Sequence, residues 1–354
     1  MPATIVVGGQ YGSEGKGKVA HFWAQRSRAN IAVRVGGPNS GHTVMDPRRG
    51  RVVFQQLPSA ALLPDVICVL GPGSYVDPTV LLAEIAAADL PPGRLFIDPH
   101  AVVVTDGSRE AETNARLREQ IGSTLSGTGA AVQSRVARDR SAVFVTALPD
   151  LAQWVAPTQP MLRAALSEGK RLILEGTQGF GLSLLHSPDY PFVTSRDTSA
   201  AGVAAEAGVS PLDVDDVVLV IRSYPIRVGG NSGPLRREVD WVTVRERGNH
   251  DHEISEFTTV TKRLRRVGEF DAALVHQAIA LNAPRHIVMN HLDYIDHDCC
   301  VAGAITERIS AFLGDAEAQI GAAIDYVGVG PQTLIERTRR RGASAPFKIT
   351  IGRP

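Results

Sequence analysis

Residues 4–18 read TIVVGGQYGSEGKGK and predict a β-strand that leads directly into a phosphate-binding loop. The run Thr4–Val7 is rich in β-branched residues, as strands are. The glycines that follow allow main-chain N–H groups to converge on an anion at the start of a helix. Val19, Phe22 and Trp23 then recur at the three- and four-residue spacing of one helix face.

This first loop departs from the standard P-loop. Gly12–Lys18 fits the pattern G-x-x-x-x-G-K, but Val19 stands where a Ser or Thr hydroxyl normally binds magnesium. A second glycine loop, residues 36–43 (GGPNSGHT), follows the predicted strand Ile31–Val35. Open α/β sheets bind ligands at the carboxyl ends of their strands, so His42 in this loop is a candidate proton donor to a developing anion.

Short apolar runs alternate with segments of helical period along the rest of the chain. We expect strands at Thr4–Val7, Ile31–Val35, Val66–Leu70, Leu95–Ile97, Leu172–Leu174, Val217–Ile221 and His286–Met289. We expect helices at Val80–Ala88, Glu110–Gln120, Met161–Leu166, Ala272–Leu281 and Thr333–Arg341. This alternation predicts an α/β fold with a largely parallel central sheet and flanking helices. Because no repeat or convincing linker interrupts it, we expect residues 1–354 to form a single domain with short excursions.

Composition excludes several classes of protein. The 354 residues include 37 Lys and Arg and 37 Asp and Glu, so no net positive charge attracts nucleic acid nonspecifically. No apolar run approaches the length of a membrane span, and the N-terminus does not resemble a signal peptide. Cys68, Cys299 and Cys300 cannot build a disulfide framework. We therefore expect a cytoplasmic protein that binds neither nucleic acid nor membrane.

The two glycine loops together closely resemble the adenylosuccinate synthetase family. Further blocks agree in order along nearly the whole chain. These blocks are residues 121–124, 136–138, 175–179, 190–195, 227–229, 261–266, 291–293 and 330–331. The resemblance implies a ligase in which a nucleoside triphosphate phosphorylates O6 of a purine monophosphate. The amine of L-aspartate then displaces that phosphate and leaves an N6-succinyl group.

The resemblance also implies which residues hold the triphosphate. It implies Mg²⁺ as cofactor, with Ser13 and Gly41 as metal ligands, and it puts Ser13 and His42 at the catalytic positions. His42 would be the acid that neutralises charge on the transferring phosphoryl group. The triphosphate-binding positions are Gly12, Ser13, Glu14, Gly15, Lys16, Gly17, Lys18, Gly41, His42, Thr43, Arg265, His291, Leu292, Asp293, Gly330 and Pro331.

Two further sets of positions follow from the same resemblance. The purine monophosphate would contact Ser13, Asn39, Ser123, Thr124, Arg138, Gln178, Thr194 and Arg263. Aspartate would contact Thr259, Val260, Thr261, Arg263 and Arg265. The two arginines offer forked donors that suit carboxylates. Arg138 would reach in from the second subunit of a homodimer.

Ser13 departs from the family's pattern, and this difference bears on which substrate the enzyme uses. Family members carry Asp at this position, where it removes the N1 proton of IMP, and a serine hydroxyl cannot act as a carboxylate-like base. Serine is shorter and uncharged, which leaves room beside N1 for the C2 amino group of guanine. The exchange resembles the phage-associated 2-aminoadenylosuccinate synthetase branch, which uses dGMP. We therefore predict that dGMP and L-aspartate are joined to give N6-succino-2-amino-2′-deoxyadenylate.

Two alternatives stay open. In the first, the chain is an ordinary adenylosuccinate synthetase that uses IMP and GTP and tolerates Ser13. In the second, it is an inactive homologue that only binds purine nucleotides. Family members read GTP with a Lys-Leu-Asp segment, whereas residues 290–293 read NHLD. The loss of the lysine favours ATP or dATP as donor, and the retained Asp293 leaves GTP possible.

Two histidine-containing stretches lie outside these blocks. Residues 250–253 read HDHE and residues 297–300 read HDCC. Neither stretch has the paired spacing of a zinc site. We expect the first to be a polar loop and the second to be a strand end.

Overall fold

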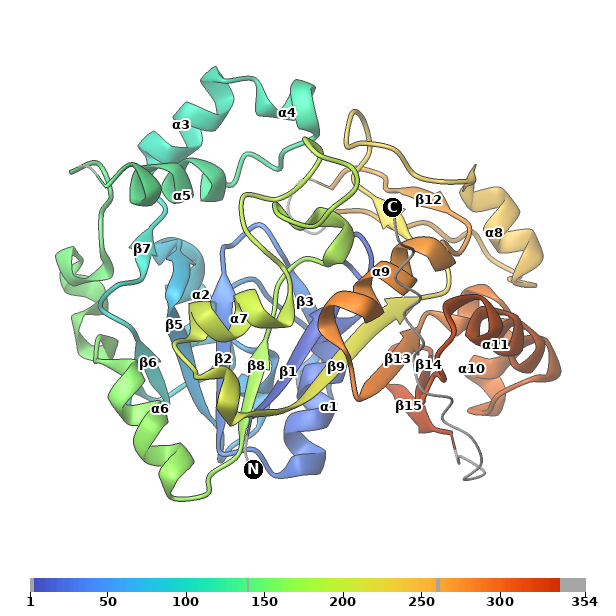
Figure 1. The fold of residues 1–354 in the computed structure, drawn as a ribbon, viewed down its shortest axis with the longest axis horizontal. Helices are drawn as coiled ribbons and strands as arrows, with labels where there is room; N and C mark the ends of the chain where they lie inside the picture. Colours follow the sequence, from blue (N-terminus) through green and yellow to red (C-terminus); the bar gives the residue numbers. More distant parts are fainter. Residues whose placement is uncertain (1–2, 139, 259–261, 338–354) are drawn as a thin grey trace, which may run out of the picture.

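A ten-stranded sheet forms the centre of the computed structural model, which describes residues 3–138, 140–258 and 262–337 (Figure 1). Its order is β15 (Thr333–Glu336), β14 (Tyr326–Val329), β13 (His286–Asn290), β9 (Val214–Arg222), β1 (Ala3–Gly8), β8 (Leu172–Glu175), β2 (Ile31–Gly36), β5 (Ile67–Val76) and β6 (Leu95–Ile97), with β7 (Val102–Val103) also paired to β5. Its pairs are parallel except β14 with β15. The predicted α/β fold class and its largely parallel sheet are confirmed.

The sequence of strand β1 is continuously apolar because both faces of the strand are buried. Ile5 and Val7 belong to the core on one face of the sheet, whereas Val6 belongs to the core on the other. Helices cover both faces, as parallel sheets require. Helix α1 (Lys16–Ser27) packs beside Val6 through Val19 and Trp23. Helices α7 (Ala200–Ala207), α9 (Ala272–Asn282) and α11 (Glu307–Ile320) contribute to the opposite core.

The remaining elements surround this sheet. The other helices are α2 (Pro78–Ala88), α3 (Asp106–Asn114), α4 (Leu117–Ile121), α5 (Thr128–Ala137), α6 (Thr158–Ser167), α8 (Trp241–Arg247) and α10 (Asp298–Ala302). A hairpin pairs β3 (His42–Asp46) with β4 (Gly50–Phe54), and a small antiparallel sheet has the order β10 (Ile226–Arg227), β12 (Arg266–Gly268), β11 (Glu238–Val239). Helices α3, α4 and α5 lie beyond the carboxyl ends of the central strands (Figure 1). They therefore stand over the edge at which ligands bind in such folds.

Two helix predictions were wrong, although each of the predicted strands is confirmed. The predicted helix Glu110–Gln120 is divided between α3 and α4, because Arg116 adopts a positive φ of 50° and turns the chain. The predicted helix Thr333–Arg341 begins as strand β15 instead. Its short Thr-Leu-Ile-Glu run pairs antiparallel with β14, so that Ile335 lies opposite Val327. Sheet pairing at this edge overrides the local helical pattern.

Arg337 follows β15 and contacts helix α11. Its guanidinium donates to Glu317 Oε1 at 2.5 Å and to the Ile324 carbonyl at 2.8 Å. It therefore joins the end of β15 to helix α11. The remainder of that predicted helix, from residue 338 onward, lies outside the described residues. Among the described helices, none is long and apolar enough to cross a membrane.

Candidate functional site

The loop between β1 and α1 is braced from inside by Glu14. This buried carboxylate accepts hydrogen bonds from the main-chain N–H groups of Gln10 at 3.1 Å and Gly12 at 2.8 Å. Its second oxygen lies 2.6 Å from Lys16 Nζ. Asn290 at the end of β13 donates to the Glu14 carbonyl at 2.8 Å. Gly15 caps α1 with φ 88°, a backbone conformation that glycine adopts without strain.

Lys18 connects α1 to the turn after β14. Its ammonium donates to the Gly330 carbonyl at 3.0 Å and to the Thr333 carbonyl at 3.1 Å. Burial lowers the pKa of Lys18 to about 8, while the charge of Asp293 opposes that shift. Gly330 and Asp293, from two segments predicted to bind the triphosphate, therefore both lie close to Lys18. The Leu292 side chain belongs to the core, so only its main chain is available to a ligand.

His42 begins β3 and lies against the N-terminal turn of α1. A Cβ atom on Gly17 would come within 2.8 Å of the His42 Cβ. The Nδ1 atom of His42 makes a short hydrogen bond to Glu175 Oε1, and its buried Nε2 has no hydrogen-bond partner among the described residues. Burial lowers the pKa of His42 to about 4, assisted by the charge of Arg34 and opposed by Glu175. The ring is therefore neutral near pH 7, with Nδ1–H donated to the carboxylate.

Glu175 positions His42, and sequence reasoning gave it no role. It lies at the carboxyl end of β8 and accepts from both Ser59 N–H and Ser59 Oγ at 2.7 Å. Arg34 lies 3.7 Å from the same carboxylate and donates to the Ser40 carbonyl at 2.9 Å, which fixes the loop before His42. The sequence signal that could have indicated Glu175 is its place at the end of an apolar strand, directly before a glycine.

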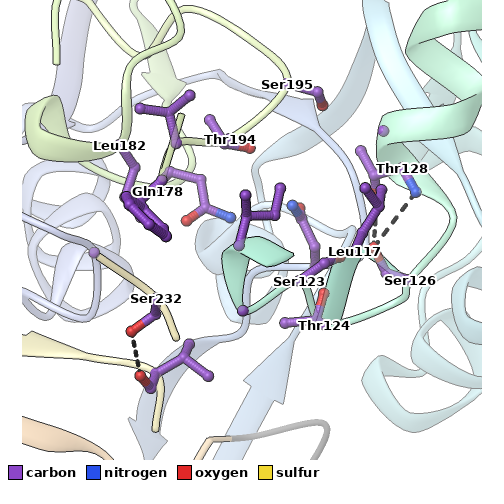
Figure 2. A pocket seen from close by; sticks show the side chains of 18 of the residues that line it. Leu117, Ser123, Thr124, Ser126, Thr128, Gln178, Leu182, Thr194, Ser195 and Ser232 are labelled. Atoms are coloured by element: carbon purple, nitrogen blue, oxygen red, sulfur yellow. Dashed lines mark hydrogen bonds between the residues drawn. The ribbon is translucent and has the colours of Figure 1, made fainter. Parts of the chain in front are cut away.

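A cavity of about 770 Å³ opens between the two glycine loops and the α3–α5 segment. Figure 2 shows Gln178 pointing into this cavity between Thr194 and the Ser123–Thr124 segment. Among the predicted site residues that line the cavity are Gly12, Ser13, Asn39, Gly41, Ser123, Thr124, Gln178, Thr194 and Arg265. The structure therefore brings together most positions expected for a purine monophosphate. Its walls also include the apolar side chains of Leu117, Ile121, Val132 and Leu182.

Glu112 is a cavity residue that the sequence did not indicate. Its carboxylate accepts from the N–H groups of Gly127 at 3.0 Å and Gly129 at 2.7 Å, at the start of α5. A helix N-terminus favours negative charge. The acid on α3 therefore fixes α5 against the cavity.

Ser13 lies on the cavity wall between two arginines. Its hydroxyl accepts from Arg265 at 2.5 Å, and its carbonyl accepts from Arg222 at 2.9 Å. Arg222 is completely buried and forms a short ion pair with Glu256. Burial alone would raise the pKa of Glu256, but the charges of Arg222 and His291 lower it to about 2. The carboxylate thus remains ionised and holds Arg222 beneath the Ser13 loop.

Other predicted residues are outside this cavity or outside the described chain. Arg138 caps the end of α5, where its side chain is exposed and does not line the cavity. Arg263 does not line it either, and Gly230 lies so close that a Cβ there would approach the Arg263 guanidinium to 2.8 Å. Thr259, Val260 and Thr261 lie outside the described residues.

Comparisons of sequence agree with this geometry. A profile of the family described as adenylosuccinate synthetase matches residues 5–148 and 140–305. The adenylosuccinate synthetase of Thermococcus sibiricus is 34% identical over 339 residues, which cover 94% of this chain and 97% of the relative. That of Methanococcus maripaludis is 35% identical over 339 residues with the same coverage.

Solved structures show the same fold. A cyanophage S-2L protein, described as succinoaminodeoxyadenylate synthetase (PurZ) bound to dGMP and to dATP as an energy donor, matches with a TM-score of 0.79. Its sequence identity is 29%, and the match covers 95% of each chain. A fully ligated adenylosuccinate synthetase from Plasmodium falciparum matches with a TM-score of 0.82 at 21% identity, covering 95% of this chain and 99% of its own. At that identity the likeness shows the fold alone.

We predict that Glu175→Gln lowers turnover by roughly 10- to 100-fold, because the amide no longer stabilises a protonated His42. The Michaelis constants should change little. Introduced into His42→Ala, the same substitution should cause almost no further loss of turnover, since the two residues act as one unit. Steady-state kinetics of the four proteins measure this coupling. Independent losses that multiply in the double variant would contradict a positioning role for Glu175.

We also predict that acid destabilises the protein through His42. Its pKa is about 4 when folded and 6.5 as a free side chain, so only the unfolded chain binds the proton between these values. Stability therefore rises with pH across this window, and lowering the pH from 7.5 to 5 should cost about 2 kcal/mol from this residue. Urea unfolding at both pH values tests this. His42→Asn, which retains an N–H donor for Glu175, should show a smaller loss; an equal loss would exclude His42 as the source.

Proposed function

This chain belongs to the adenylosuccinate synthetase family of C–N bond-forming ligases, and we propose that the purine nucleotide it uses is dGMP. In this proposal the γ-phosphoryl group of ATP or dATP is transferred to O6 of dGMP, and N1 loses its proton. The amine of L-aspartate then attacks C6 and expels phosphate. The products are N6-succino-2-amino-2′-deoxyadenylate, the nucleoside diphosphate and phosphate, a step toward 2-aminoadenine precursors of DNA.

The observation that carries this proposal is Ser13 on the cavity wall. Its hydroxyl is neutral and already accepts from Arg265 at 2.5 Å. A short side chain here leaves space for the C2 amino group that distinguishes guanine from hypoxanthine. The cyanophage protein of similar fold is described with dGMP and dATP bound, which supports both the substrate and an adenine donor.

Ser13 cannot remove the N1 proton itself, because a serine hydroxyl is a poor base near neutral pH. We propose that a phosphate oxygen of the bound nucleotide or a bound water accepts this proton. Arg265 and Arg222 beside Ser13 favour that route, since positive charge stabilises the anion that N1 becomes.

His42 would act on the transferring phosphoryl group. Its neutral ring in the free protein has Nδ1–H directed at Glu175 and leaves Nε2 to receive a proton. A triphosphate bound beside the ring brings negative charge, which raises the pKa of a histidine. We propose that His42 then becomes protonated on Nε2 and donates a hydrogen bond to the phosphoryl oxygens while Glu175 balances the imidazolium charge.

Mg²⁺ is the proposed cofactor, and the oxygen atoms at this edge of the cavity fit it. Magnesium prefers oxygen ligands and keeps several waters and phosphate oxygens. The Gly41 carbonyl is the ligand we favour, because the Ser13 hydroxyl faces the Arg265 cation. When bound, Mg²⁺ would neutralise charge on the triphosphate.

We propose further that the whole chain is one domain and that it acts as a homodimer. The central sheet draws its strands from residue 3 to residue 336, which supports a single domain. Arg138 is exposed at the end of α5, and the adjacent Ala137 lines the cavity. We therefore assign Arg138 to the site of the neighbouring subunit. Thr259–Thr261, Arg263 and Arg265 remain the proposed aspartate-binding segment.

A comparison of substrates tests the proposed function. Purified protein with Mg²⁺, L-aspartate and ATP or dATP should release phosphate and form a succinyl product with dGMP faster than with GMP or IMP. A parallel series with GTP identifies the donor. Product formation with IMP alone would make the chain an ordinary adenylosuccinate synthetase. Binding of nucleotides without phosphate release from any of them would indicate an inactive homologue.

Substitutions of Ser13 test its role directly. Ser13→Asp should lower dGMP turnover by about 10-fold or more, because the longer carboxylate fills the space beside C2 and pairs with Arg265. Ser13→Asn is the matched control for size without charge, and Ser13 has φ 57°, which asparagine tolerates. Ser13→Ala keeps the space and should retain more activity than either. Equal or better dGMP turnover in Ser13→Asp would overturn the steric argument.

A further inference from the structure

Three histidines that the sequence separates converge on the outer side of the chain's C-terminal half. His250 and His252 follow helix α8, and His297 precedes helix α10. One ring nitrogen from each lies within 4.8 Å of the others. The ring centroids of His250 and His297 are 4.5 Å apart, and that of His252 lies 5.6 Å from His250 and 5.4 Å from His297. Residues 250–253 form a loop, as predicted, whereas the prediction of a strand end at residues 297–300 was wrong, because helix α10 begins at Asp298.

The main chain holds the two segments together without help from a ligand. His297 N–H donates to the Gly248 carbonyl at 2.8 Å, and His250 N–H donates to the Arg245 carbonyl at 3.1 Å. Gly248 is required at this point, because a Cβ atom there would lie 2.8 Å from the His250 ring and 2.9 Å from the Tyr294 carbonyl. The backbone therefore fixes the position of His250 and His297 before any cation binds.

The ring nitrogens are available as ligands. Within the described part of the chain, both ring nitrogens of His250 and Nδ1 of His297 are buried and make no well-formed hydrogen bond. A buried polar atom without a partner is uncommon and calls for an explanation. His252 differs, because its Nδ1 is hydrogen-bonded to Asp251 Oδ1 at 2.7 Å. A carboxylate on one nitrogen fixes the tautomer and leaves Nε2 for a metal, which is the usual arrangement at metal-binding histidines.

We propose that His250, His252 and His297 form a site for a transition-metal cation of the zinc class. Three imidazole nitrogens suit Zn²⁺ and similar ions, whereas Mg²⁺ prefers oxygen. Tetrahedral ligands at about 2.1 Å from zinc lie about 3.4 Å from one another. In the proposed site, the exposed His252 moves toward the other two rings when the cation binds, and a water molecule is the fourth ligand. The cation would clamp the segment after α8 to the segment that carries Asp293, independently of which nucleotide the enzyme uses.

Calorimetric titration of the metal-free full chain with Zn²⁺ tests the proposal. We expect one Zn²⁺ per chain, a higher thermal midpoint in its presence, and tetrahedral absorption bands when Co²⁺ replaces it. His252→Gln should weaken Zn²⁺ binding at least ~10-fold. His252 is 59% exposed in its side chain, so the variant should fold, and its metal-free thermal midpoint checks this.

His100→Gln is the matched control. His100 is also exposed and hydrogen-bonded through Nδ1 to an aspartate, Asp98, but it does not belong to the three-histidine group. Its substitution should leave Zn²⁺ affinity unchanged. Cys300→Ser serves as a second control, because the exposed Cys300 is another soft ligand nearby. Absence of 1:1 binding, unchanged affinity in His252→Gln, or a loss of binding confined to Cys300→Ser would each overturn the proposal.

Discussion

The buried carboxylate of Glu175 is the constraint on which the geometry of the proposed catalytic edge of the sheet depends. It ends β8, which lies between β1 and β2 in the sheet, and it holds His42 and Ser59 from two other segments. Burial alone would raise the pKa of Glu175, but the hydrogen bond and charge of His42, with Arg34 and Ser59, lower it. An ionised acid in the interior must have such partners. These partners also hold the second glycine loop. The buried charge of Glu175 therefore sets the distance between the carboxyl ends of the strands and His42, the proposed proton donor.

A second ion pair, between the buried Arg222 and the partly buried Glu256, holds the first glycine loop. Arg222 pairs with Glu256 and donates to the Ser13 carbonyl, and Tyr294 donates to Glu256 at 3.0 Å. This network holds the loop that contains Ser13, the residue proposed to select the substrate. Removing one member would leave a buried charge without its partner, which costs more than a surface ion pair contributes. The Ser13 loop is therefore held in place by contacts to its main chain that a substitution of the Ser13 side chain leaves intact.

The sequence predicted the elements that depend on local pattern and missed those that depend on distant partners. Strand β1 was predicted from its run of β-branched residues, and helix α1 from apolar residues at three- and four-residue spacing. Strand β15 was assigned to a helix, because its pairing with β14 leaves no mark in a four-residue run. The loop residues Ser13 and Gln178 were found by resemblance, and both line the cavity. Glu175 had no role in the prediction, since its partners are 116 and 133 residues away.

By itself the sequence determined the fold class and the family and predicted that the first loop binds phosphate, because glycine spacing, runs of β-branched residues and ordered motifs are local properties of a chain. Only the tertiary structure decided that His42 is neutral and held by Glu175, that Ser13 lies between Arg222 and Arg265, and that His250, His252 and His297 meet. The reason is that the charge state and the contacts of a side chain depend on the groups that surround it in space. Those surroundings come from strands and loops that the sheet brings together from distant parts of the chain.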